Sequence, residues 1–364
     1  MRKRRDKKEE EGSFQSFLLT LAVLFLIVMT FKSSVLDANN IPSGSMIPTL
    51  KIGDYLFVNK MRYSLRVPFS EYEIFRYDNP VRGDVVTFIP PRDTGKRYVK
   101  RVIGMPGDRI RIRYIPFCSI PEFVKSSSFD RGIPRDFECS SPDEPYVAIV
   151  EYRENDAGPW KSNQIKLLSA RLAEEILIDA DDARMLVPSR RPFNSYEMPV
   201  SVLLEEVIGE KVHRIVETAT YPHLDEELDE SGFCSRIEME SVGCLIPPDR
   251  YFVMGDNRDN SRDSRMLGLI SREKILGKAL IIYFSINWYD VICKDYFSFL
   301  SNDHRQSRQG FNLPDFSPED QGKYCSRLDT LADGETPLGW VKRTVFHRIP
   351  RMDVRWSRIL NLIK

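Results

Sequence analysis

The amino-acid sequence predicts a mainly β protein, in which a sheet body carries an inserted subdomain and follows one transmembrane helix. Residues 12–31 contain no charged side chain. Short strand-like runs punctuated by glycine and proline dominate the chain after this stretch. Residues 115–246 are rich in serine, proline and acidic residues, and they separate two stretches with a more regular pattern. With 364 residues and 42% hydrophobic content, the chain can bury a full core.

The uncharged stretch is long enough to cross a membrane, because about 20 helical residues span a hydrocarbon core of about 30 Å. Its centre, FLLTLAVLFLIVMT, contains only two polar residues, both threonines. A buried core helix would show a polar stripe. A cleaved export signal would have a shorter apolar region and end in a small-x-small site, which Leu36-Asp37-Ala38 matches poorly. We therefore predict a transmembrane helix over residues 14–32.

Charge is informative only near this span. Residues 1–13 form a basic tail, which predicts a cytoplasmic N-terminus and sends residues after about 35 across the membrane. The chain as a whole has 53 basic and 53 acidic side chains, so its net charge gives no case for nucleic-acid binding.

All six cysteines follow the span, on the side of the membrane where disulfides can persist. Fifteen connectivities are possible, and free buried thiols remain an alternative. Proximity favours pairing of neighbours, with Cys234–Cys244 first and Cys118–Cys139 and Cys293–Cys325 next. The cysteine spacing resembles no zinc site, and none of the four histidines lies within two residues of a cysteine. We expect no metal and no cofactor.

The strand-like runs and the composition predict how the domains are arranged. A main domain is expected over residues 35–114 and 247–364, interrupted by an accessory subdomain over 115–246 and by a polar insertion at about 292–349. Within the accessory subdomain, apolar residues at helical spacing predict an amphipathic helix over about 164–187 that packs locally. The predicted strands are 55–58, 85–89, 98–103, 109–114, 211–216, 251–254 and 279–284.

Four stretches stand out as motifs: IPSGSMIPTL at residues 41–50, RGDVVTF at 82–88, YVKRVIGMPGD at 98–108 and MGDNRDNSRDSR at 254–265. Together they resemble the signature boxes of the bacterial signal peptidase I family, in the family's order and after a membrane span. The resemblance covers roughly residues 14–114 and 247–290, with a looser likeness at 354–358.

A serine hydroxyl needs a base to act as a nucleophile, and none of the four histidines lies in a motif-like setting. A lysine can serve if burial lowers its pKa from about 10.4 toward neutrality. Lys100 suits this role because it lies within the apolar run of residues 98–103.

The resemblance assigns the individual roles. It implies Ser45 as the nucleophile, Lys100 as the general base, and the Ser43 hydroxyl together with the Ser45 backbone N–H as the oxyanion hole. It further implies that Ser261 hydrogen-bonds the lysine, that Gly255 allows a close approach, and that Asp263 and Arg265 form a supporting ion pair. Without the family, Ser43 and Ser45 would be read as turn residues and residues 256–260 as a solvated loop.

Three further features bear on the substrate and the membrane. Met46 and Val99 flank the nucleophile and the base, so they can form shallow pockets for small substrate residues, although both are also ordinary core residues. Asn39 and Asn40 replace residues that are more apolar in the family, which leaves substrate preference open. Trp288 and Tyr289 can contact the lipid interface or pack in the core.

The expected function is removal of N-terminal signal peptides from exported precursor proteins, by cleavage after small residues through an acyl-Ser45 intermediate. The expected location is a bacterial inner membrane, with one span and the catalytic domain on the periplasmic or extracytoplasmic side. A self-cleaving repressor with the same chemistry is disfavoured by the span. A membrane-tethered binding protein would not need Ser45, Lys100 and their supporting residues together.

Overall fold

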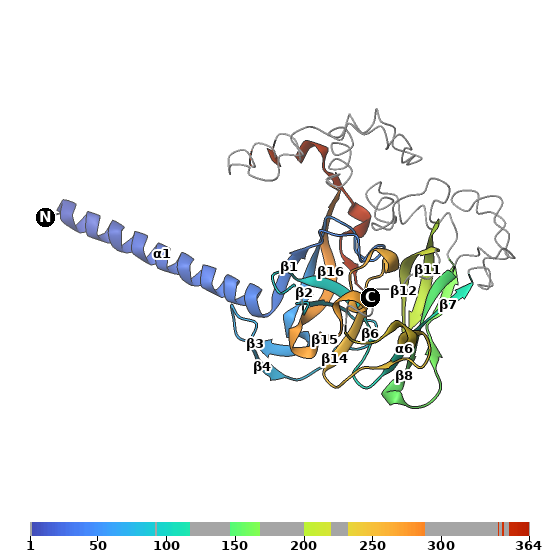
Figure 1. Ribbon diagram of the computed structural model, residues 1–364. Coiled ribbons are helices and arrows are strands. Elements are labelled where there is room, and N and C mark those ends of the chain that lie inside the picture. The colour runs from blue at the N-terminus through green and yellow to red at the C-terminus, as the bar shows by residue number, and fades with distance from the viewer. Residues whose placement is uncertain are drawn as a thin grey trace, which may run out of the picture.

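The computed structural model describes residues 2–91, 93–116, 146–167, 200–219, 232–287, 341, 344–345 and 349–363. Helix α1 (Arg2–Ser34) projects from a β-rich body (Figure 1). Its part Ser16–Ser34 has a mean hydropathy of 2.1 and is not buried in the protein, so it is long and apolar enough to cross a membrane. This segment nearly coincides with the predicted span, and the body is mainly β, as the sequence predicts.

The main sheet brings distant parts of the chain together through antiparallel pairing. Its order is β1-β2-β16-β5-β6-β14-β15, and two short strands near the C-terminus also pair with β16. Its strands are β1 (Leu36–Asn40), β2 (Asp54–Asn59), β5 (Val85–Phe88), β6 (Tyr98–Gly104), β14 (Arg250–Met254), β15 (Ile270–Ser271), β16 (Ile275–Asn287), β17 (Asp353–Val354) and β18 (Asn361–Leu362).

The next strand along the chain after β6 belongs to a second sheet. In strand β7 (Arg109–Pro116), Ile110 and Ile112 are buried while the alternating Arg109, Arg111 and Arg113 are more accessible, so the predicted alternation holds. β7 pairs with β8 (Tyr146–Arg153) and β13 (Cys244–Leu245), and β9 (Lys161–Ser162) pairs with β8. The sheet therefore joins the predicted catalytic body to the predicted accessory subdomain.

A three-stranded sheet contains β10 (Gln164–Leu167), β11 (Val200–Ile208) and β12 (Lys211–Ala219). The predicted helix over 164–187 is wrong at its start, because residues 164–167 pair with β11 in an extended conformation. Cross-strand pairing prevails over the helical spacing, which begins only at Leu168. Residues 168–187 lie outside the described part of the chain.

The remaining short elements connect these sheets. They are the hairpin strands β3 (Ser64–Arg66) and β4 (Glu73–Arg76), the short helices α6 (Arg236–Glu240) and α7 (Ser264–Leu267), and the 3₁₀ turns Lys60–Arg62, Glu154–Asp156, Arg258–Asn260, Arg272–Lys274, Ile349–Arg351 and Trp356–Arg358.

A disulfide joins Cys234 to Cys244, with Cα atoms 6.1 Å apart, which confirms the first predicted pairing. The disulfide connects the segment before α6 to β13, and both cysteines pack in the core with Met239. Cys118, Cys139, Cys293 and Cys325 lie outside the described residues.

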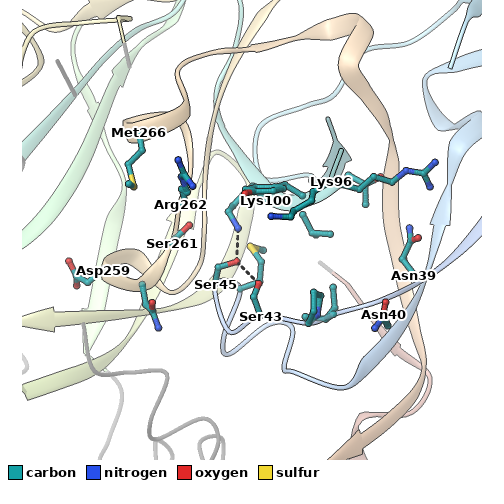
Figure 2. Close-up of a pocket in the computed structure, with 18 residues that line it drawn as sticks. Asn39, Asn40, Ser43, Ser45, Lys96, Lys100, Asp259, Ser261, Arg262 and Met266 are labelled. Carbon is teal, nitrogen blue, oxygen red and sulfur yellow. Dashed lines mark hydrogen bonds between the residues drawn. The ribbon is translucent and has the colours of Figure 1, made fainter. Parts of the chain in front are cut away.

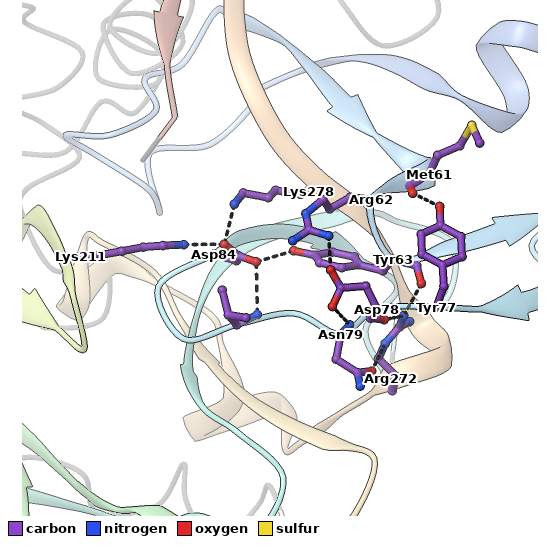
Figure 3. A network of polar contacts seen from close by, with 11 residues as sticks. Met61, Arg62, Tyr63, Tyr77, Asp78, Asn79, Asp84, Lys211, Arg272 and Lys278 are labelled. Atoms are coloured by element: carbon purple, nitrogen blue, oxygen red, sulfur yellow. Dashed lines mark hydrogen bonds and ion pairs between the residues drawn. The ribbon is translucent and has the colours of Figure 1, made fainter.

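The buried Asp84 joins the three-stranded sheet to the main sheet (Figure 3). Its carboxylate accepts hydrogen bonds from Lys211 at the start of β12, from Lys278 of β16 at 2.7 Å and from the Tyr63 hydroxyl at 2.7 Å. Burial opposes ionisation of Asp84, but the two lysines and the tyrosine overcome it and hold the pKa of the carboxyl below its usual value. β12 is thus anchored by charge as well as by packing.

Candidate active site

Ser45 and Lys100 come together from separate elements (Figure 2). Ser45 lies in the loop after β1, and Lys100 lies on β6 with only 3% of its surface exposed. Lys100 Nζ donates a hydrogen bond to Ser45 Oγ at 2.5 Å. A nucleophile and a base in hydrogen-bonding contact are the arrangement that serine acylation needs.

Burial changes the chemistry of the Lys100 amine. Loss of hydration lowers the pKa of Lys100 to about 8, while Asp263 and Asp256 act to raise it and Arg265 acts to lower it. A sizeable fraction of the amine is therefore neutral near physiological pH, and only the neutral amine can accept a proton.

The cleft in front of this pair has a volume of about 610 Å³. Ser43 and Ser45 line it, and the Ser43 hydroxyl is 3.5 Å from Ser45 Oγ. The buried Met46 and the partly buried Val99 also line the cleft. The cleft is also lined by Asn39 and Asn40, and at its other end by Ser261 and Met266.

A loop over residues 255–265, hereafter the 255–265 loop, lies beside Lys100. A Cβ on Gly255 would collide with Ser45 O and with the side chain of Ser261, so only glycine permits this approach. The Gly255 N–H donates to Asp263 Oδ2 at 3.0 Å. Arg265 donates to both oxygens of the fully buried Asp263, at 2.9 Å each.

The expected hydrogen bond between Lys100 and Ser261 is not formed. The Ser261 hydroxyl is buried and makes no hydrogen bond to Lys100. It packs over Gly255, and it is close enough to Asp263 to help lower the pKa of that carboxyl. Ser261 therefore lies beside Gly255 and Asp263 without a hydrogen bond to Lys100.

Sequence reasoning did not single out a second buried pair, Arg101 and Asp256. Arg101 donates to both carboxylate oxygens of Asp256, at 2.8 and 2.7 Å, and both side chains are almost completely buried. Thr49, from the loop over residues 41–53 that also holds Ser45, donates to the same carboxylate. The available signal was position, because Arg101 follows Lys100 and Asp256 follows Gly255.

Asn257 is the other residue that sequence reasoning passed over. Its backbone N–H donates to Ser45 O and its amide Nδ2 donates to Gly44 O, each at 3.1 Å. The 255–265 loop therefore holds the backbone of Gly44 and Ser45 through Asn257 and lies near Lys100 through Asp263 and Arg265.

Residues 14–115 and 198–284 match the protein family described as "Signal peptidase, peptidase S26". The chain belongs to this family. The match includes β11 and β12, so the likeness to the signal peptidase family extends beyond residues 14–114 and 247–290 and into the predicted accessory subdomain.

Curated relatives agree over most of their length. The "Signal peptidase I" of Buchnera aphidicola subsp. Schizaphis graminum is 30% identical over 285 residues, which cover 76% of this chain and 77% of the relative. That of Aquifex aeolicus is 30% identical over 269 residues, covering 74% and 82%. A crystal structure of a signal peptidase I from Enterococcus faecalis is 18% identical and covers 55% of this chain and 97% of its own, with a TM-score of 0.21.

Proposed function

We propose that this chain is a signal peptidase I, a serine endopeptidase that removes N-terminal signal peptides from exported precursor proteins after small residues. The observation that carries this proposal is the contact between the buried Lys100 amine and Ser45 Oγ in the cleft. Family membership supports the reaction class, and the contact supports Ser45 and Lys100 as the two residues that perform the reaction.

In the proposed mechanism, neutral Lys100 takes the Ser45 proton as Oγ attacks the scissile carbonyl. The Ser43 hydroxyl and the Ser45 backbone N–H stabilise the oxyanion of the tetrahedral intermediate. The Lys100 ammonium then gives its proton to the departing amine, which leaves an acyl-Ser45 ester. Lys100 next activates a water molecule that hydrolyses this ester and regenerates the serine.

The proposal places residues 1–13 in the cytoplasm and the body on the extracytoplasmic side of a bacterial inner membrane. The β3–β4 hairpin supports a body close to the bilayer. Its tip is bonded to the end of α1, since Phe69 N donates to Ser33 Oγ at 2.5 Å. The hairpin also exposes Tyr72, Ile74 and Phe75. Trp288 and Tyr289, the expected lipid contacts, lie outside the described residues.

The domain division also remains a proposal. Residues 35–114 and 247–364 form the catalytic body, and residues 115–246 form an accessory subdomain attached to it. Support comes from the cleft, whose lining residues all belong to the two catalytic stretches.

The test is cleavage of a secretory precursor by the detergent-solubilised full chain. Wild type should release the signal peptide, and Ser45→Ala should not, because it lacks the attacking oxygen. Ser162→Ala, a surface change on β9, is the matched control and should cleave like wild type. No cleavage by wild type in any lipid or detergent, or equal cleavage by Ser45→Ala, would refute the proposal.

A further inference from the structure

The 255–265 loop is attached to the strands of the accessory subdomain as well as to the nucleophile. Val216 of β12 donates its backbone N–H to Asp256 O at 2.8 Å and forms an isolated parallel bridge with Asn257. The same Asn257 bonds the backbone of Ser45. The backbone of β12 is therefore connected to the loop that holds Ser45 through the two consecutive residues Asp256 and Asn257.

A buried ion pair makes a second connection. Arg258 in the loop donates through Nη2 to Glu206 Oε2 on β11, and both side chains are almost completely buried. Asn163 Nδ2 donates to the other carboxylate oxygen at 3.1 Å, and His213 Nε2 lies 2.9 Å from Oε2. Burial alone would raise the pKa of Glu206, but Arg258 and His213 overcome it and hold that pKa well below its usual value. Glu206 is therefore ionised.

Arg258 is in turn connected to the groups around the base. Its backbone carbonyl accepts a hydrogen bond from Arg265 Nη2, the same atom that donates to Asp263. Asp263 and Arg265 act on Lys100 in opposite directions, since the carboxylate favours the ammonium form and the guanidinium disfavours it. The position of the Arg265 guanidinium thus determines how much it offsets the rise that Asp263 causes in the pKa of Lys100.

Building on the proposed function, we propose that Glu206 is a positioning residue of the active site, which fixes Arg258 and through it Arg265 so that Lys100 is kept ready as the base. Glu206 does not line the cleft, so it acts only through these residues. The accessory strands then contribute to the chemistry, although none of their side chains lines the cleft.

Other charged groups close to this path do not replace Glu206. Burial, together with Asp259, raises the pKa of Glu217 to about 8, so this carboxyl is mostly neutral near pH 7 and Glu206 is the charged partner of Arg258. The charged or titratable groups that face Glu206 and Arg258 are His213, Glu217 and Asp256. Arg265 is faced by Asp263, Asp259 and Tyr114, and Lys100 by Tyr98, Asp256, Asp263 and Arg265.

The deciding variant is Glu206→Gln in the full chain, with Glu210→Gln in the exposed turn after β11 as the matched control. The readout is modification of Lys100 by acetic anhydride as a function of pH, quantified by mass spectrometry, beside kcat and KM for a peptide substrate. Loss of the Glu206 charge loosens Arg258 and Arg265, so Asp263 stabilises the ammonium more strongly. The labelling midpoint should move up by about 0.5 to 1 pH unit in Glu206→Gln.

In the same variant, kcat at pH 7 should fall by about 3- to 10-fold, as the shift of the midpoint requires, and recover at higher pH, with KM unchanged. Glu210→Gln should match wild type in every measurement. A merely structural role for Glu206 would lower the melting temperature and leave the labelling midpoint in place, and that result would overturn the proposal.

The double variant Glu206→Gln with Arg258→Gln leaves no unpaired buried charge, so it decides the question if the single variant fails to fold. It should show the same upward shift, and an unchanged midpoint in it would refute the positioning role. Labelling of Lys100 does not depend on cleavage. A wild type that cleaves no precursor would therefore refute the proposed function, while the labelling midpoints would still decide the role of Glu206.

Discussion

Arg101 donates two hydrogen bonds to Asp256 in the interior of the body. Arg101 follows Lys100 on β6, and Asp256 lies two residues after the end of β14. β6 and β14 are neighbours, and Met254 faces Arg101 in the register. The pair therefore fixes the start of the 255–265 loop to the strand that carries Lys100. Thr49 also donates to Asp256, so the same carboxylate holds the loop that contains Ser45.

Asp256→Asn should destabilise the protein strongly, since it leaves the buried Arg101 guanidinium without its counter-charge. The free energy of unfolding should fall by about 3 to 5 kcal/mol, as measured by denaturant titration in detergent. Asp249→Asn is the control, because Asp249 pairs with Arg76 on the surface and should matter little. Equal effects of the two variants would contradict the buried-pair interpretation.

The rate of peptide cleavage should rise with pH through the pKa of Lys100, which lies at about 8. Burial disfavours the ammonium form, so the pKa of Lys100 in the folded protein is below the ordinary 10.5. The active neutral amine therefore dominates above pH about 8. Below that pH, kcat should fall about tenfold per pH unit. A pH–rate profile measures this, and a profile flat from pH 6 to 9 would contradict it.

Lys100→Arg should be inactive throughout the same pH range, because a guanidinium stays protonated. Lys161→Arg on the exposed strand β9 conserves charge in the same way and should keep the wild-type profile. Turnover by Lys100→Arg at the wild-type rate would remove Lys100 from the mechanism.

Gly255→Ala should reduce cleavage because the added methyl group collides with Ser45 O and Ser261. Displacement of the nucleophile by about 1 Å can cost about 100-fold in kcat. Gly95→Ala provides the matched control, because a Cβ at that glycine meets no atom within 4 Å. Steady-state kinetics of both variants would measure the effect, and normal kcat in Gly255→Ala would show that the backbone can yield there.

Local patterns in the sequence predict much of the fold and the pair at the centre of the site. Alternation in residues 109–114 fixes which isoleucines are buried, and the apolar neighbours of Lys100 indicate that its amine leaves water. Both properties depend on a few consecutive residues, so they can be predicted from the sequence without knowledge of the fold.

The contacts that depend on distant pairing could not be predicted in this way. Glu206 meets Arg258, and Arg101 meets Asp256, only because strands far apart in sequence become neighbours. The conformation of Gln164–Leu167 likewise depends on β11, which begins more than 30 residues later. The contact of Ser261 with Gly255 depends on how its loop packs, which a motif does not specify.

Replacing both Cys234 and Cys244 by serine should lower the free energy of unfolding by about 3 kcal/mol, because the disulfide no longer constrains the unfolded chain. Thermal unfolding with and without reductant would measure this. Reductant should lower the melting temperature of wild type and have less effect on the double variant. Mass mapping that finds both thiols free in non-reduced wild type would contradict the prediction.

The β3–β4 hairpin should contact lipid when the full chain is in a bilayer. Leu65 pairs with Phe75 on this two-stranded sheet, Phe75 is 62% exposed, and Tyr72 and Ile74 are exposed beside it. The bond from Phe69 to Ser33 joins the tip to the end of the candidate span. With that span in the bilayer, as proposed, lipid is the apolar phase nearest to these side chains.

Changing Tyr72 and Phe75 together to serine should weaken this contact by about 1.5 to 3 kcal/mol for each ring that leaves the lipid. Cleavage of a membrane-inserted precursor in proteoliposomes should fall several-fold, while cleavage of a short soluble peptide in detergent should not change. Ile237→Ser on α6 removes an equally exposed apolar side chain and should affect neither substrate. Equal loss on both substrates would mean that the hairpin supports the fold, and no loss on either would mean that it does not enter the bilayer.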